Sequence, residues 1–178
     1  MPSSTRYDPV AIALHWLLAL AIAGAFSVGL YMHDLPLTPL RLKLFNWHKW
    51  AGITILSLSA LRLSWRLTHR PPPDLPMPAW QARAAHGVHL ALYLLFFAVP
   101  LAGWAYSSSA GFPVVVFGIL PLPDFVPVDR ALSQALKSLH GLLAWTLAAA
   151  AVLHVAAAFK HHWVDRDGLL LRMRPGRG

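Results

Sequence analysis

The chain has 178 residues, of which 57% are hydrophobic and only 12% are charged. This composition is typical of membrane proteins and excludes an ordinary soluble domain. The absence of cysteine excludes disulfides, thiolate-bound iron–sulfur clusters and the covalent attachment of c-type haem. The net charge of +8 indicates membrane topology and lipid headgroups rather than nucleic acid, because the basic residues flank apolar segments.

Four apolar segments follow one another, at about residues 10–32, 45–67, 85–106 and 138–160. Each is long enough to cross a bilayer as a helix, and the short alternating strands of a membrane barrel are absent. The first segment lacks a signal-peptidase exit, so we expect it to be retained as a membrane helix. The sequence therefore predicts an all-α, integral membrane four-helix bundle that forms a single membrane domain over residues 1–178.

The connections between these segments are polar or rich in proline. They cover residues 33–44, a second loop that starts at 68–74, and a long third loop at 107–137. The third loop contains an apolar stretch, 112–122, that is too short to span and holds three prolines if the next residue, Pro123, is counted. We expect this stretch to lie at the membrane interface or to fold over the mouth of the bundle.

Basic residues are distributed unequally between the two sides of the predicted bundle. One side carries ten: Arg6, Arg62, Arg66, Arg70, Arg83, Lys160, Arg166, Arg172, Arg174 and Arg177. The other carries five: Arg41, Lys43, Lys49, Arg130 and Lys137. The positive-inside rule then predicts that both termini are cytoplasmic, in the inner membrane of a bacterium.

Four histidines occur at two depths of the predicted bundle. His140 and His154 are fourteen residues apart, which is a rise of about 21 Å and almost four whole turns, so both lie on one helix face. His48 has the depth of His140, and His15 has that of His154. Polar residues inside a membrane are costly and usually functional. The arrangement predicts two bis-histidine haem b groups, held non-covalently by His15 with His154 and by His48 with His140.

Small residues lie on or beside the histidine face of the fourth segment and next to His48. They are Gly52, Gly141, Ala144, Ala148, Ala151 and Ala158. They give room for a flat macrocycle, or they serve the close helix packing that is common in membranes. The candidate cationic partners of haem propionates are Arg41, Lys49 and Lys137 on the outer side and Arg62 and Arg66 on the inner side.

Three further histidines lie near the inner level. His86 and His89 share a helix face, and either is a candidate axial ligand, a quinone contact, a proton donor or a structural residue. His161 follows His154 by seven residues on the same face, just outside the apolar core. A histidine there is suited to bind a quinone carbonyl and to pass a proton to it.

These residues occur in motifs that resemble the bacterial cytochrome b561 family along essentially the whole chain. The motifs are 12–17 (IALHWL), 47–52 (WHKWAG), 86–90 (HGVHL), 137–140 (KSLH), 153–158 (LHVAAA) and the tail at 161–162 and 170–175. The family scheme takes one haem ligand from the first helix, one from the second and two from the fourth. This scheme matches His15, His48, His140 and His154.

The resemblance implies a di-haem protein that oxidises superoxide and reduces ubiquinone to ubiquinol. Two haems can hold two electrons, which suits a one-electron donor and a two-electron acceptor. Superoxide is an anion, so we expect outer cations, above all Lys49, Arg130 and Lys137, to attract it, unless they contact lipid phosphates or propionates instead. Quinone would then be reduced at the inner haem, near His89 and His161.

The sequence leaves two alternatives to this function. A related di-haem subunit could anchor a periplasmic dehydrogenase or hydrogenase and pass its electrons to quinone with the same four ligands. A metal-binding permease is disfavoured, because its histidines would gather at one depth and the seven acidic residues lie in the predicted loops.

Overall fold

The computed structural model describes residues 6–176, and Arg177 lies outside them. Its four long helices are α1 (Pro9–His33), α2 (Pro39–Thr68), α3 (Ala79–Ser109) and α4 (Arg130–Lys160). A two-stranded antiparallel hairpin, β1 (Val115–Val116) and β2 (Leu120–Pro121), lies between α3 and α4. A π-helical turn, His161–Asp165, and a 3-10 helix, Leu169–Met173, follow α4. The predicted all-helical architecture is thus confirmed, apart from this small hairpin.

The helices begin earlier than the apolar segments do, because polar caps and prolines start them. Asp8 caps α1 by accepting from the N–H of Ala11 at 2.9 Å, and Thr38 and Asp129 cap α2 and α4 in the same way. Proline occupies the first position of α1 and of α2, where its missing N–H costs nothing. Loss of such a cap costs about 1 kcal/mol. Hydropathy alone therefore places the starts of α2 and α4 about two turns too late.

Three helices of the described residues are long and apolar enough to cross a membrane: Pro9–His33, Ala79–Ser109 and Arg130–Asp165. The helix α2 is about 45 Å long but does not reach the same hydropathy, since it carries Arg41, Lys43, Lys49, Arg62 and Arg66. Large apolar side chains such as Leu20 and Leu142 are 69% and 65% exposed, as expected for surfaces that face lipid. Three of the four predicted spans thus fall on helices that are long and apolar enough to cross a membrane, and all four spans stay predictions.

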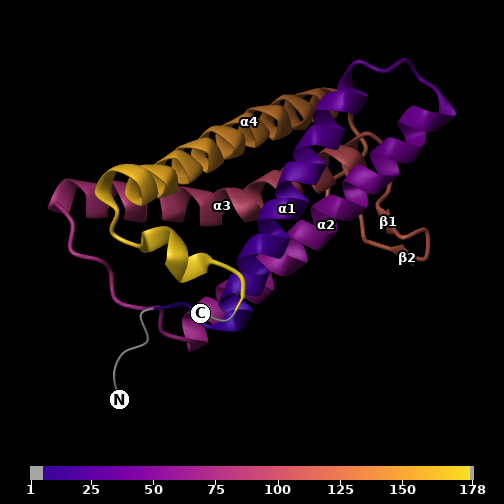
Figure 1. The fold of residues 1–178 in the computed structure, drawn as a ribbon. Helices are drawn as coiled ribbons and strands as arrows, with labels where there is room; N and C mark the ends of the chain where they lie inside the picture. Colours follow the sequence, from indigo (N-terminus) through magenta and orange to yellow (C-terminus); the bar gives the residue numbers. More distant parts are fainter. Residues whose placement is uncertain (1–5, 177–178) are drawn as a thin grey trace.

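The helices form two pairs. Figure 1 shows α1 beside α2 and α3 beside α4, with the two pairs crossing at an angle, and contacts between α2 and α3 join them. By contrast, α1 and α4 make little backbone contact. We call the end of the bundle that carries β1 and β2 the hairpin end, and the end that carries residues 6 and 176 the terminal end.

The loop at the hairpin end is shorter than predicted and lies against α2. The helix α3 continues through Ser109, and the connection between α1 and α2 is only residues 34–38. The apolar stretch 112–122 folds into the hairpin, where Lys49 Nζ donates to the carbonyl of Pro113 at 3.1 Å and Trp50 Nε1 to that of Val115 at 2.7 Å. These two bonds fix the hairpin beside α2.

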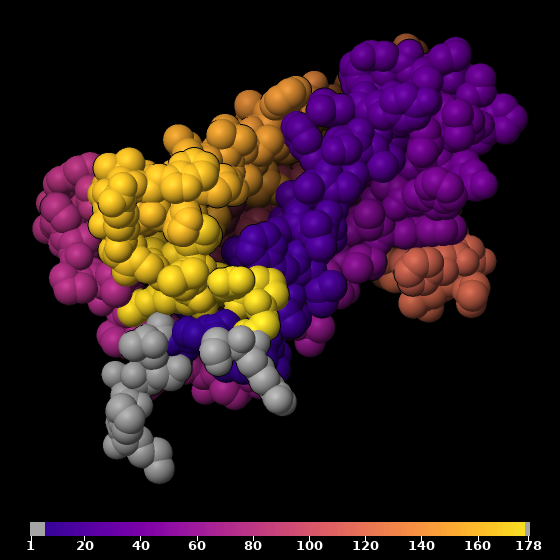
Figure 2. Space-filling view, in the orientation of Figure 1, coloured from indigo at the N-terminus to yellow at the C-terminus, as the bar shows by residue number. Residues whose placement is uncertain are grey.

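At the terminal end the chain returns across the bundle as a C-terminal strap, residues 166–174. The N–H of Tyr7 donates to the carbonyl of Arg172 at 3.3 Å, and Trp16 Nε1 donates to that of Met173 at 2.8 Å. Arg172 Nη1 in turn donates to the carbonyl of Pro73 at 2.7 Å. Figure 2 shows the yellow C-terminal residues packed against the indigo N-terminal ones. The strap therefore covers the terminal end of the space between the helix pairs.

Candidate functional site

A cavity of roughly 1990 Å³ lies between the two helix pairs and is lined by residues of all four helices. Nine histidines line its walls: His15, His33, His48, His69, His86, His89, His140, His154 and His161. Pockets for a single small ligand usually measure about 300–1,000 Å³. The cavity is therefore large enough for two sizeable groups placed end to end.

At the hairpin end the cavity contains one imidazole pair. The ring centroids of His48 on α2 and His140 on α4 are 6.1 Å apart, with an interplanar angle of 88°. Two imidazoles that bind one iron from opposite sides have centroids about 6 Å apart, since each Fe–N bond is about 2 Å long. The observed spacing fits an iron between these two rings.

Backbone hydrogen bonds hold both rings in the orientation that metal binding requires. The Nδ1–H of His48 donates to the carbonyl of Ala25 at 3.0 Å, and that of His140 donates to the carbonyl of Val99 at 3.0 Å. A carbonyl oxygen can only accept, so each Nδ1 carries the proton and each Nε2 has a free lone pair. Ligating histidines in metal sites are usually oriented in this way.

Two glycines make room for these rings. A Cβ added to Gly29 would lie 3.1 Å from the His48 ring, and one added to Gly103 would lie 2.9 Å from the His140 ring. Each glycine follows the carbonyl that accepts from the same histidine by four residues, one helical turn. Sequence reasoning missed both glycines, because no local motif links them to a histidine on another helix.

Gly52 and Gly141, which the sequence indicated as room for a macrocycle, line the cavity. A Cβ added to either would meet no atom within 4 Å. They therefore face open space rather than a neighbouring helix, which favours the macrocycle over close helix packing as the reason for a small residue.

At the terminal end three imidazoles lie close together. The His15 and His154 centroids are 6.1 Å apart, the same spacing as at the hairpin end, and the His89 and His154 centroids are 5.3 Å apart. Among the described residues no hydrogen bond orients any of these three rings. The spacing favours His15 as the partner of His154. His86 lies apart, with its Nε2 3.2 Å from Asp74 Oδ2 on an exposed surface.

Two arginines of α2 line the cavity, one near each of its ends, and each has a buried N–H donor that lacks a hydrogen-bond partner in the described part of the chain. Within residues 6–176, Nε of Arg41 and Nη1 of Arg62 are buried and have no hydrogen-bond partner. Other donors of the same side chains do bind, Arg41 Nη2 to the carbonyl of His33 at 3.2 Å and Arg62 Nε to the hydroxyl of Tyr93 at 3.4 Å. Buried donors are rarely left unpaired. A carboxylate-bearing cofactor at each level, such as haem with its propionates, would satisfy both.

The three cations predicted to attract superoxide occupy different places. Lys137 lines the cavity, whereas Lys49 is bound to the hairpin backbone and Arg130 is the first, exposed residue of α4, outside the cavity lining. Arg66, the second inner cation, lines the terminal end of the cavity together with Arg62. Lys137 and Arg41 are therefore the cations best placed at the hairpin mouth.

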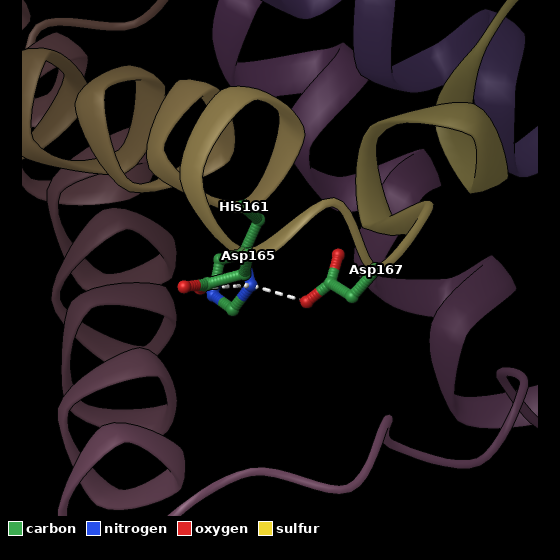
Figure 3. A group of neighbouring side chains, drawn as sticks. All are labelled: His161, Asp165 and Asp167. Carbon is green, nitrogen blue, oxygen red and sulfur yellow. Dashed lines mark hydrogen bonds and ion pairs between the residues drawn. The ribbon is translucent and has the colours of Figure 1, made fainter.

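His161 lies at the terminal end of the cavity and is 9% exposed. Its Nδ1 is 2.5 Å from Asp167 Oδ2 and 3.2 Å from Asp165 Oδ2 (Figure 3). Asp165 also accepts from Lys160 Nζ at 2.7 Å. The π-helical turn and the strap bring these groups together. The sequence predicted His161 but neither aspartate, because both lie beyond the last apolar segment and no motif links them to His161.

The helical membrane protein has buried, paired imidazoles at two levels of one cavity. These features are those of a membrane haem-binding electron-transfer protein. The model of the prokaryotic cytochrome b561 family matches residues 6–176, and the chain belongs to this family, which binds haem b. It is a multi-pass protein of the bacterial inner membrane.

Three relatives cover nearly the whole chain. Cytochrome b561 homolog 2 of Escherichia coli K12 is 36% identical over 170 residues, 94% of this chain and 90% of the relative. Probable superoxide oxidase CybB of Yersinia pestis is 32% identical over 171 residues, 96% of each chain. Cytochrome b561 homolog 1 of Escherichia coli K12 is 32% identical over 177 residues, 97% of this chain and 98% of the relative.

Proposed function

We propose that this chain holds two haem b groups and passes electrons from superoxide to ubiquinone. One haem would bind between His48 and His140, and the other between His15 and His154. The observation that carries the proposal is the equal 6.1 Å spacing of the two ring pairs in one cavity. The name of the Yersinia pestis relative, probable superoxide oxidase, supports the choice of electron donor.

Two haems would accommodate the difference between the number of electrons that superoxide donates and the number that ubiquinone accepts. Superoxide gives one electron, whereas ubiquinone takes up two electrons and two protons to become ubiquinol. When bound, the haems would supply a one-electron store at each level. The chain sets their separation, because His140 and His154 are about 21 Å apart along α4.

The two ends would then have different tasks. The excess of basic residues at the terminal end supports a cytoplasmic location of that end and of both termini, and a periplasmic location of the hairpin end. Superoxide would arrive at the hairpin end, where Arg41 and Lys137 line the cavity. Quinone would bind at the terminal end, where His89 and His161 line it.

The test is a dithionite-reduced visible spectrum with pyridine haemochrome quantitation, followed by mixing the oxidised protein with superoxide and then with ubiquinone. Two b haems per chain that superoxide reduces and ubiquinone reoxidises would support the proposal. Two haems that superoxide does not reduce would instead support a subunit that serves a periplasmic dehydrogenase or hydrogenase. Absence of haem would overturn both.

The exposed hairpin is the observation that keeps the subunit function as a second candidate. Phe117 and Ile119 are 64% and 83% exposed at the hairpin end, where such a partner would dock. Purification of the membrane protein under mild conditions distinguishes the two functions. A large redox partner that remains bound would favour the subunit, and a haem protein that is active alone would favour the oxidase.

Lys137→Gln is expected to slow the reduction of the protein by superoxide by about 10-fold at low ionic strength, because steering of a small anion depends on charge at the mouth. The difference from the wild type should shrink as salt is added. Arg130→Gln is the matched control, since Arg130 lies outside the cavity lining. Stopped-flow absorbance measures both rates. Equal rates for Lys137→Gln and wild type at low salt would contradict a steering role.

Gly103→Ala is expected to displace the His140 ring, because the new Cβ would lie 2.9 Å from it. Haem content should then fall from about two groups per chain towards one. Gly87→Ala on the same helix is the control, since its Cβ would meet no atom within 4 Å. Pyridine haemochrome analysis measures the content. Two haems of unchanged spectrum in Gly103→Ala would show that the ring is not held where the structure places it.

A further inference from the structure

The cluster around His161 has one residue that ties it to the strap. Asp167 Oδ2 accepts from His161 Nδ1 at 2.5 Å, and Asp167 Oδ1 accepts from the N–H of Leu169 at 2.9 Å. Left-handed residues flank Asp167 on both sides, Arg166 with φ of 53° and Gly168 with φ of 76°. A non-glycine residue in this region is unfavourable, so the backbone is held in an uncommon turn that brings the carboxylate back to the ring.

The geometry is that of a hydrogen-bonded pair rather than of a metal centre. His161, Asp165 and Asp167 offer ligand atoms within 4.8 Å of one another. Two ligands of one tetrahedral ion are about 3.3 Å apart, given bonds of about 2 Å. The 2.5 Å between His161 and Asp167 is shorter than that, and Lys160 already neutralises Asp165. An ion would have to break both interactions.

Asp167 is suited to remain a carboxylate. Burial raises the pKa of Asp167, but the hydrogen bond from the Leu169 N–H, the hydrogen bond from His161 and the charge of His161 together lower it further, so the pKa lies below its ordinary value. The carboxylate then accepts the Nδ1–H of His161. Nε2 is left as the ring nitrogen that can serve a ligand in the cavity.

We propose that Asp167 is a positioning residue for proton transfer to a quinone at the terminal end. This inference rests on the proposed function, in that it needs a quinone beside His161. The imidazolium form of His161 gives its Nε2 proton to a quinone oxygen, so an N–H bond breaks and an O–H bond forms. Asp167 accepts the hydrogen bond from Nδ1–H throughout, and its negative charge balances the positive charge of the protonated ring.

The step balances within the overall reaction. One quinone takes up two electrons and two protons, and two superoxide ions supply the electrons and become two molecules of O₂. One proton comes through His161, which is protonated again from water at the terminal end, and the second comes from water directly. Asp167 itself neither gains nor loses a proton.

The experiment follows reoxidation of the dithionite-reduced protein by a short-chain ubiquinone under anaerobic conditions, across a range of pH. Asp167→Asn is expected to slow reoxidation by on the order of 10- to 100-fold, which is at or below the lower end of the roughly 10²- to 10⁴-fold effect of a positioned acid or base, because His161 itself is retained. Its pH profile should also move to lower pH, because loss of the negative charge disfavours the protonated ring. Asp167→Glu, which keeps the charge, should restore much of the rate.

Asp165→Asn is the matched control. It removes the carboxylate that pairs with Lys160 and lies 3.2 Å from His161 Nδ1, and it leaves the shorter 2.5 Å bond between His161 and Asp167. Other titratable or charged groups line the terminal end of the cavity: Tyr7, Asp8, His15, Arg62, Arg66, His69, Arg70, Asp74, His86, His89, Tyr93, His154, Lys160 and Arg172. These groups are the same in every variant, so a difference between the pH profiles reports on the substituted carboxylate.

Two further readouts separate positioning from a loss of structure. The visible spectrum reports the haem sites, and trypsin cleavage of the bond between Arg172 and Met173 reports whether the strap stays docked. Slow reoxidation of Asp167→Asn with an unchanged spectrum, a docked strap and rescue by glutamate would support the proposal. A wild-type rate, an equal defect in Asp165→Asn, or a released strap that glutamate does not rescue would overturn it. The assay uses no superoxide, so its result does not depend on whether superoxide reduces the protein.

Discussion

Replacing His140 with alanine is expected to remove the haem at the hairpin end and to leave the one at the terminal end. The ring faces His48 at 6.1 Å and is held by the carbonyl of Val99, and alanine offers no ligand atom in its place. Haem content should fall from about two per chain to about one. Reduction by superoxide should fall by more than about 100-fold, because even outer partners of metal ligands commonly contribute 10- to 100-fold.

The matched control is His162→Ala, in the π-helical turn that follows α4. His162 is exposed, and within residues 6–176 its side chain makes a ring contact with Trp163 and no hydrogen bond, so this variant should keep both haems. Pyridine haemochrome analysis and low-temperature spectra count the haems and distinguish the two. Retention of two haems in His140→Ala would contradict the assignment of this ring as an axial ligand.

Helical periodicity was sufficient to pair the four histidines. Fourteen residues of helix return His154 to the face of His140, and the depths of His15 and His48 followed from their places in apolar segments. Those relations depend on one helix at a time. The structure then brings His15 to His154 and His48 to His140 at equal ring spacings.

Relations between helices could not be predicted in the same way. Gly29 and Gly103 matter because they lie against imidazoles of other helices, and the carbonyls of Ala25 and Val99 matter because those same imidazoles reach them. The tertiary fold decides which turn of α1 meets His48. Likewise, no local pattern predicts that the chain turns back after Arg166 and places Asp167 on His161.

The role of the arginines of α2 could not be predicted from the sequence either. Charges lowered the hydropathy of that helix, and the sequence indicated only that they lie at two levels. Their buried, unpaired donors became visible once the cavity was defined, with Arg41 near one end and Arg62 near the other. An arginine that is energetically unfavourable within a membrane span can thus be functional if an anionic group binds beside it.

His15→Ala is expected to remove the haem at the terminal end, whereas His89→Ala should retain it. Both rings lie next to His154, but only His15 has the 6.1 Å spacing that an iron between two imidazoles requires, and His89 at 5.3 Å is too close. If His89 instead serves the quinone, His89→Ala should keep about two haems and slow reoxidation by ubiquinone. Haem content and reoxidation rate, measured on both variants, separate the roles. Loss of a haem in His89→Ala with retention in His15→Ala would reverse the assignment, and would make His15 the residue free to contact the acceptor.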